Sequence, residues 1–98
     1  MVRIEIKKLE NVALLKLQEG TYEELSKIEI KNIRGLGGFT IKETLSYLID
    51  TKEVGYVAYN FKTIEQCNMF ADELKIVVRN INNGIKGVYK LKIWLTQH

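Results

Sequence analysis

The side chains best suited to catalysis are few in this sequence. The single histidine, His98, is the terminal residue, and chain ends are usually poorly ordered. The single cysteine, Cys67, shares an apolar helical face with Phe70 and Ala71, so we expect a buried thiol and not a reactive thiolate. No His, Cys, Asp or Glu residues have the spacing of a metal site. We therefore expect no enzyme, metal or cofactor.

A glycine-rich segment is the first candidate for binding. The residues of this segment that we expect to take part in binding are Arg34, Gly35, Gly37 and Gly38. They precede Thr40, which is a strong helix N-cap with Glu43 three residues later. Exposed backbone amides at a helix start, together with the helix dipole, form an anion site. The alternative is a plain connection whose glycines serve only for conformational freedom.

Residues 33–45 resemble the hairpin and second helix of the helix–hairpin–helix DNA-binding motif. That motif has an apolar–x–Gly–apolar–Gly core whose amides hold a DNA phosphate without reading bases. Residues 35–37 match this core, and Ile33 and Leu45 match its flanking apolar positions. Ile41 departs from the motif, which normally has a small residue there so that its helices pack closely. The resemblance implies contact with the DNA backbone.

Cations and aromatic rings share a second candidate surface. On the last predicted strand, Lys90, Lys92 and Trp94 lie opposite the core-facing residues. If helices cover only one side of the sheet, outward residues of the first and third strands join them. The full set is Arg3, Lys7, Tyr56, Lys90, Lys92 and Trp94. Such a face suits phosphates and stacked bases, but exposed rings can equally mark a homodimer interface.

Hydrophobic periodicity predicts the elements that position these residues. Residues 2–7 alternate and indicate a strand with the apolar side chains of Val2, Ile4 and Ile6 facing inward. After a turn, the apolar run 12–17 is either a second strand or the start of a helix.

The middle of the chain contains two capping signals. Thr21 begins a capping box that opens a short helix, and Thr40 opens a helix of about residues 41–50. Residues 27–33 fit either a strand or a helix.

The C-terminal half has the clearest pattern. Residues 55–61 predict a strand, Thr63 caps a helix reaching about Asn80, and residues 88–95 predict a final strand. This is a β–α–β unit. Its two strands are parallel if they are adjacent, with a right-handed crossover, or separated by a third strand in a ferredoxin-like arrangement.

These elements predict one α+β domain spanning residues 1–98. We expect a two-layer sandwich, with a small mixed β-sheet, helices mainly on one face and a C-terminal β–α–β unit. The formal charge of +3, from 15 basic and 12 acidic residues, permits an anionic partner but does not demand one. We find neither a membrane-length apolar run nor a signal peptide, and therefore expect a cytoplasmic protein.

Three function classes fit these patterns, and one of them is a small-ligand binder that uses the glycine-rich segment as a phosphate cradle. The first is a non-enzymatic nucleic-acid-binding accessory protein, dimeric, that contacts phosphates through the basic and aromatic sheet face. The alternative is a small homodimeric structural or regulatory module that uses the same face for protein–protein interaction. Salt separates the nucleic-acid binder from the interaction module, because phosphate contacts release counterions.

Overall fold

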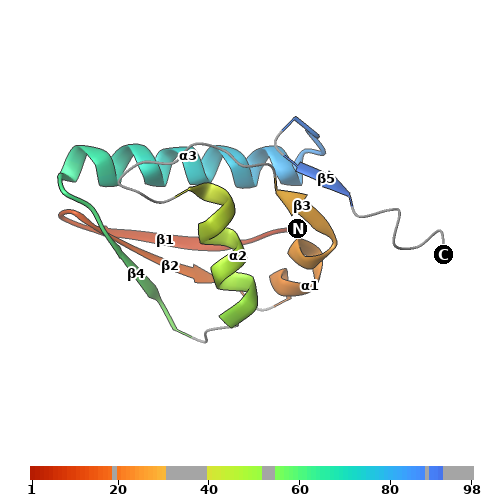
Figure 1. The fold of residues 1–98 in the computed structure, drawn as a ribbon, viewed down its shortest axis with the longest axis horizontal. Coiled ribbons are helices and arrows are strands. Elements are labelled where there is room, and N and C mark those ends of the chain that lie inside the picture. Colours follow the sequence, from red (N-terminus) through yellow and green to blue (C-terminus); the bar gives the residue numbers. More distant parts are fainter. Residues whose placement is uncertain (19, 31–39, 52–54, 88, 92–98) are drawn as a thin grey trace.

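A computed structural model describes residues 1–18, 20–30, 40–51, 55–87 and 89–91. These residues form five strands and three helices, shown in Figure 1. In chain order they are β1 (Ile4–Leu9), β2 (Val12–Leu17), α1 (Thr21–Ser26), β3 (Ile28–Ile30), α2 (Ile41–Thr51), β4 (Val57–Asn60), α3 (Ile64–Asn82) and β5 (Tyr89–Leu91). The predicted α+β class is confirmed.

The main sheet is antiparallel, with the strand order β1–β2–β4. Its first two strands form a hairpin, and Glu10 in the turn adopts a left-handed backbone with φ 55°. The ambiguous run 12–17 is thus a strand. Apolar side chains lie on both of its faces, but only Ala13, Leu15 and Leu17 are buried. These three side chains mark the face of the sheet that forms the core.

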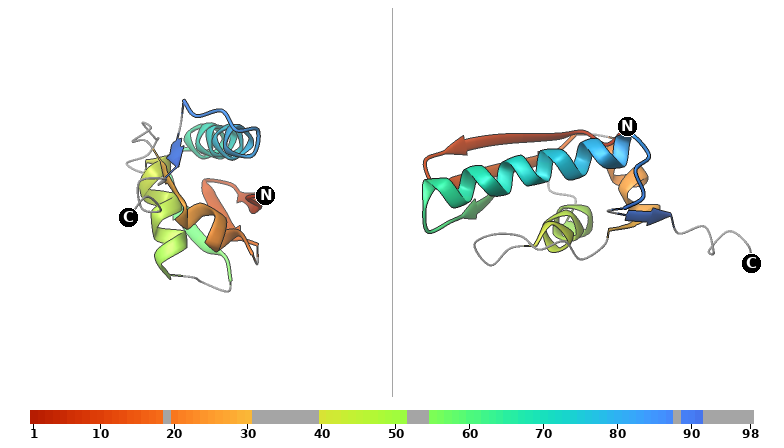
Figure 2. Two further views of the ribbon diagram at one scale, coloured as in Figure 1. Left: turned by 90° about the vertical axis from the view of Figure 1, so that its right-hand side faces the viewer. Right: turned by 90° about the horizontal axis from the view of Figure 1, so that it is seen from above.

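Helices α2 and α3 lie on the same side of the main sheet (Figure 2). α3 runs along the strands and α2 crosses them (Figure 1). The predicted apolar faces of both helices are buried in one core with the main sheet. The residues of α2 and α3 in that core are Ile41, Leu45, Leu48, Cys67, Phe70, Leu74, Val77, Val78 and Ile81. Val2 is buried with them, and Ile4 and Ile6 are half-buried against them, as the alternation predicted.

The C-terminal strand departs from the predicted sheet. β5 pairs antiparallel with β3 in a separate small sheet, with Ile30 opposite Tyr89, so β4 and β5 are not neighbours. The length of α3 explains this. Its 19 residues extend about 28 Å and carry the chain from β4 to the far end of the molecule, where β3 lies (Figure 1). The two strands of the predicted β–α–β unit thus lie in different sheets, so neither expected arrangement, the parallel pair or the ferredoxin-like order, is formed by the described strands.

Two of the three predicted helix caps are confirmed. Thr63 Oγ1 accepts a hydrogen bond from the Gln66 backbone N–H at 3.1 Å, at the start of α3. Thr40 Oγ1 accepts one from the Glu43 backbone N–H at 3.0 Å, at the start of α2. Each side chain satisfies an amide that the first turn of a helix leaves without a partner.

The third cap was assigned wrongly. Gly20, with φ 89°, occupies the N-cap position of α1, and Thr21 is already inside the helix and buried. The Thr21 hydroxyl instead accepts from the Arg3 backbone N–H at 3.1 Å and donates to the Arg3 carbonyl at 3.2 Å. Thr21 therefore fastens the beginning of β1 to α1.

Candidate functional site

The face of the main sheet opposite α2 and α3 is the open face. Strand alternation and register place its residues, because side chains on opposite positions of antiparallel strands share a face. They are Arg3, Glu5, Lys7, Leu9, Val12, Leu14, Lys16, Tyr56, Ala58 and Asn60. Three of the predicted site residues, Arg3, Lys7 and Tyr56, are thus brought to one surface.

A polar cluster, the Tyr56 cluster, lies near the middle of this face. The Tyr56 hydroxyl donates a hydrogen bond to the Glu5 carboxylate. The ammonium groups of Lys7 and Lys16 lie 4.9 and 5.6 Å from the centroid of the Tyr56 ring. Interaction with the Tyr56 side chain raises the pKa of Lys7, which keeps this lysine charged. The Tyr56 ring therefore lies within cation–π range of two ammonium groups, one from β1 and one from β2.

The charge of the open face is mainly positive. Arg3, Lys7 and Lys16 contribute three cations, while Glu5 contributes one carboxylate. Arg3 and Lys7 are exposed and Tyr56 is 37% exposed, so a ligand can reach all three. Lysine stems are flexible, and their ammonium groups can move from the ring to a phosphate. The arrangement can bind an anion beside a stacked planar group.

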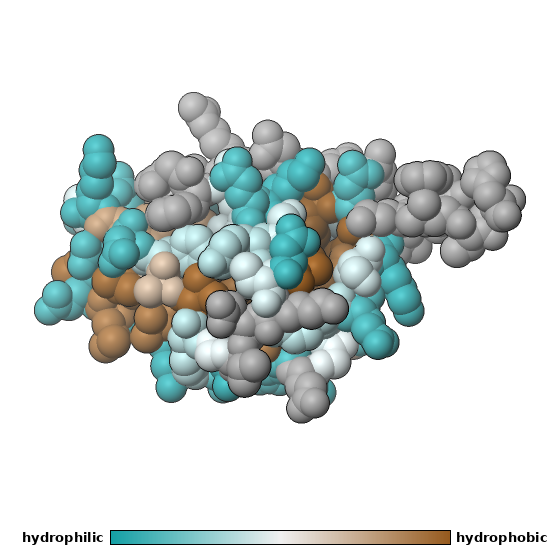
Figure 3. All heavy atoms as spheres, turned by 60° about the horizontal axis from the view of Figure 1, so that its bottom comes forward, coloured by the Kyte–Doolittle hydropathy of each residue, from teal (hydrophilic) through white to brown (hydrophobic). Residues whose placement is uncertain are grey.

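Apolar side chains continue the open face toward the hairpin turn. Leu9 is 64% exposed, and Val12 and Leu14 are half-buried. Apolar surface gathers at the end of the molecule that carries the hairpin turn and the start of α3 (Figure 3). This part of the face suits a partner with apolar groups.

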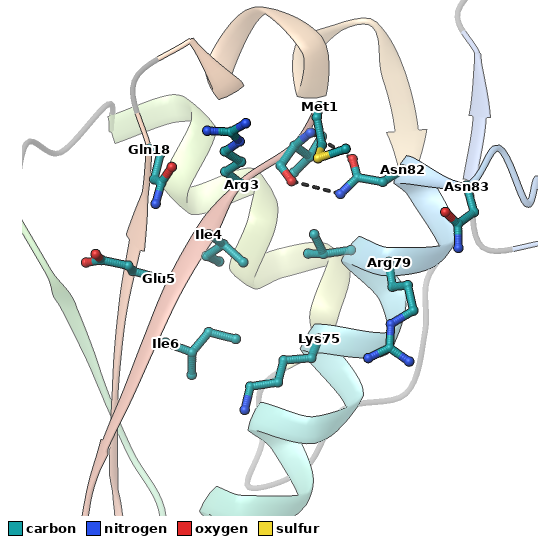
Figure 4. A pocket seen from close by; sticks show the side chains of 12 residues that line it. Met1, Arg3, Ile4, Glu5, Ile6, Gln18, Lys75, Arg79, Asn82 and Asn83 are labelled. Atoms are coloured by element: carbon teal, nitrogen blue, oxygen red, sulfur yellow. Dashed lines mark hydrogen bonds between the residues drawn. The ribbon is translucent and has the colours of Figure 1, made fainter.

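A groove of about 740 Å³ follows the outer edge of β1 (Figure 4). Ile4 and Ile6 line it on the side of β1 that faces α3, and Lys75 and Arg79 extend over it from the helix. Asn82 closes one end. Its side-chain amide accepts from the Val2 backbone N–H at 2.8 Å and donates to the Val2 carbonyl at 2.9 Å.

The remaining predicted site residues do not join the open face in the described structure. Lys90 belongs to β5, which lies in the small sheet, so the predicted continuous stripe across one sheet is not formed. The other residues lie outside the described ranges: Arg34, Gly35, Gly37, Gly38, Lys92 and Trp94. Their role in binding stays a prediction.

Two members of the Tyr56 cluster, Glu5 and Lys16, were not singled out from the sequence. Lys16 is the only polar residue of an apolar run that fits either strand or helix. Assigning that run to a strand would have placed Lys16 on the outward face, and the strand register then puts it opposite both Glu5 and Tyr56. The signal was present in the alternation, but the hairpin pairing was needed to use it.

The two side chains first considered for catalysis are Cys67 and His98. Cys67 is fully buried, as predicted, and burial raises the pKa of its thiol. His98 lies outside the described ranges. Within those ranges, no three His, Cys, Asp or Glu side chains gather as a metal site. None of the described helices is both long and apolar enough to cross a membrane.

Comparison with protein-family models, curated protein sequences and solved structures finds no match to this chain. Its function is therefore inferred from the residues and geometry of the site.

Proposed function

We propose that this protein is a non-enzymatic nucleic-acid-binding accessory protein that uses the open face. The observation that carries the proposal is the Tyr56 cluster, in which Lys7 and Lys16 lie within 6 Å of an exposed ring. Single-stranded nucleic acids bind surfaces that combine cations along the backbone path with aromatic rings for base stacking. In this role Arg3, Lys7 and Lys16 contact phosphates and Tyr56 stacks on a base.

The test is retention on an immobilised single-stranded oligonucleotide and on the matching duplex, over a range of salt concentrations. Replacing Lys7 and Lys16 together with alanine should weaken binding to every sequence about equally. On single strands it should also flatten the log–log salt dependence by about 0.7 for each phosphate that is no longer neutralised. The matched control replaces Lys27 and Lys86, two exposed lysines outside the open face, and should change the slope far less.

The ring is tested separately. Tyr56→Ala should cost about 1–3 kcal/mol on single strands and little on duplex, whose bases are already stacked. Tyr56→Phe keeps the ring and removes only the hydrogen bond to Glu5, so it should retain most of the affinity. Wild-type protein that shows no salt-sensitive retention at about 50 mM salt would refute the proposal.

The apolar part of the same face favours a second candidate function, a homodimeric protein-interaction module. Leu9 is largely exposed, and Val12 and Leu14 form apolar surface next to it. An interface of this kind barely responds to moderate salt. Leu14→Lys should then abolish association with a protein partner, whereas alanine at Lys16 should leave it nearly unchanged.

A further inference from the structure

The outer edge of β1 has main-chain groups available for another strand. The Gln18 backbone N–H donates to the Arg3 carbonyl at 3.0 Å, so the odd-numbered residues of β1 point their main-chain groups toward β2. The main-chain groups of Ile4, Ile6 and Lys8 therefore point away from the sheet. In the described part of the chain, no strand pairs with β1 on that side. An edge of this kind is a template for strand addition.

The available edge has definite ends. At one end, the Asn82 amide occupies the main-chain groups of Val2, as a neighbouring strand would. At the other end, the left-handed Glu10 turns the chain into β2. The free positions run from Ile4 to Lys8 and are centred on Ile6. An added antiparallel strand that uses the whole edge must therefore be centred on Ile6.

The charges of β1 are self-complementary about that centre. When two copies of β1 pair antiparallel around a two-fold axis through Ile6, Glu5 lies opposite Lys7 of the second copy. The symmetry repeats this pair on the other side of the axis. These positions form the closer, non-hydrogen-bonded type of cross-strand pair, where opposite charges stabilise the association.

α3 carries a second complementary pair at the same level. Measured from the Val2–Asn82 contact, Ile6 lies about 13 Å along β1, which corresponds to about nine residues of helix, near position 73. Asp72 and Lys75 are both exposed and lie on one side of α3, three residues apart. The same two-fold axis brings Asp72 of one copy toward Lys75 of the other. Both charge patterns thus select a second copy as the occupant of the edge.

We propose that two copies of this chain pair through their β1 edges, antiparallel and centred on Ile6, to form one continuous six-stranded sheet. This pairing is independent of nucleic-acid binding, because neither the edge nor its charge pattern requires a bound ligand. The main-chain contact lies at the edge of the sheet, and the side chains of the Glu5–Lys7 pairs lie along the border of the open face, next to the Tyr56 ring.

The test uses two charge variants that are repulsive alone and complementary together. Glu5→Lys places lysine opposite lysine, and Lys7→Glu places glutamate opposite glutamate, so each should raise the dissociation constant about tenfold or more. An equimolar mixture should associate with nearly wild-type affinity. Sedimentation equilibrium without nucleic acid separates the 11.4 kDa monomer from the dimer. Lys86→Glu, a matched charge reversal at an exposed position beyond α3, should associate like the wild type.

A second pair of variants, Asp72→Lys and Lys75→Asp, follows the same design in α3 and serves if a β1 variant does not fold. Recovery of the dimer on mixing either pair supports the proposal. A wild type that stays monomeric at tens of micromolar overturns it and leaves the edge to a strand of a different protein. Single variants that dimerise as well as the wild type overturn it too, since the contact then lies elsewhere.

Discussion

Replacing Asn82 with alanine tests whether its amide serves as a neighbouring strand for the beginning of β1. The change removes two hydrogen bonds, of 2.8 and 2.9 Å, to the main chain of Val2. Val2 is only 3% exposed. Each such bond contributes about 0.5–1.5 kcal/mol net, so the pair contributes about 1–3 kcal/mol. Alanine is the better helix former and returns up to about 0.5 kcal/mol at this last residue of α3. We expect a net loss of about 0.5–3 kcal/mol.

Urea unfolding followed by circular dichroism measures this loss, at one fixed protein concentration so that association does not contribute. Asn82→Asp keeps an acceptor for the Val2 N–H but places an oxygen against the Val2 carbonyl, so it should not recover the stability. The matched control is Asn83→Ala, one residue further on, which should lie within about 0.5 kcal/mol of the wild type. An Asn82→Ala protein as stable as the wild type, or an Asn83 control that loses as much, would refute this role for the Asn82 amide.

Two further predictions follow from buried groups. Burial, with the charge of Tyr47 as a smaller contribution, raises the pKa of Tyr59. The stability that this phenol contributes is complete below its ordinary pKa of about 10 and is lost as the pH rises through the raised value. Tyr59→Phe should therefore show a smaller loss in urea stability between about pH 8 and pH 11 than the wild type. The Cys67 thiol, also with a raised pKa from burial, should react with a thiol reagent at neutral pH only as fast as the protein unfolds. Rapid labelling of native protein would contradict this.

Much of the fold could be predicted because local periodicity carries it. Alternation gave the inward side chains of β1, and helical spacing with threonine caps gave α2 and α3. Thr21 shows where local patterns stop being sufficient. Its sequence matches the capping pattern, but its hydroxyl forms hydrogen bonds with the main chain of Arg3, 18 positions earlier in the chain. A local sequence pattern cannot show that a distant residue competes with the helix cap for the same hydroxyl.

In the candidate site, too, local alternation predicts which side chains point outward, whereas strand pairing decides which of them meet. Arg3, Lys7 and Tyr56 could be found because each points outward on its own strand. The meeting of Lys7 with the Tyr56 ring depends on the pairing of β1 with β2 and of β2 with β4. The assignment of Lys90 to the same face required β5 to join that sheet, but α3 leads the chain to β3, with which β5 pairs. The groove beside β1 depends on how α3 packs, which no local spacing encodes.

The division of the strands between two sheets also orders the events of folding on the ribosome. The β1–β2 hairpin needs only neighbouring residues and can form as soon as residue 17 has emerged. The main sheet is completed only when β4 arrives, about 40 residues later. β3 emerges before β4 but has no partner until residues 89–91 have been made. The small sheet is therefore the last pairing to close, and until then β3 presents an unpaired edge to its surroundings.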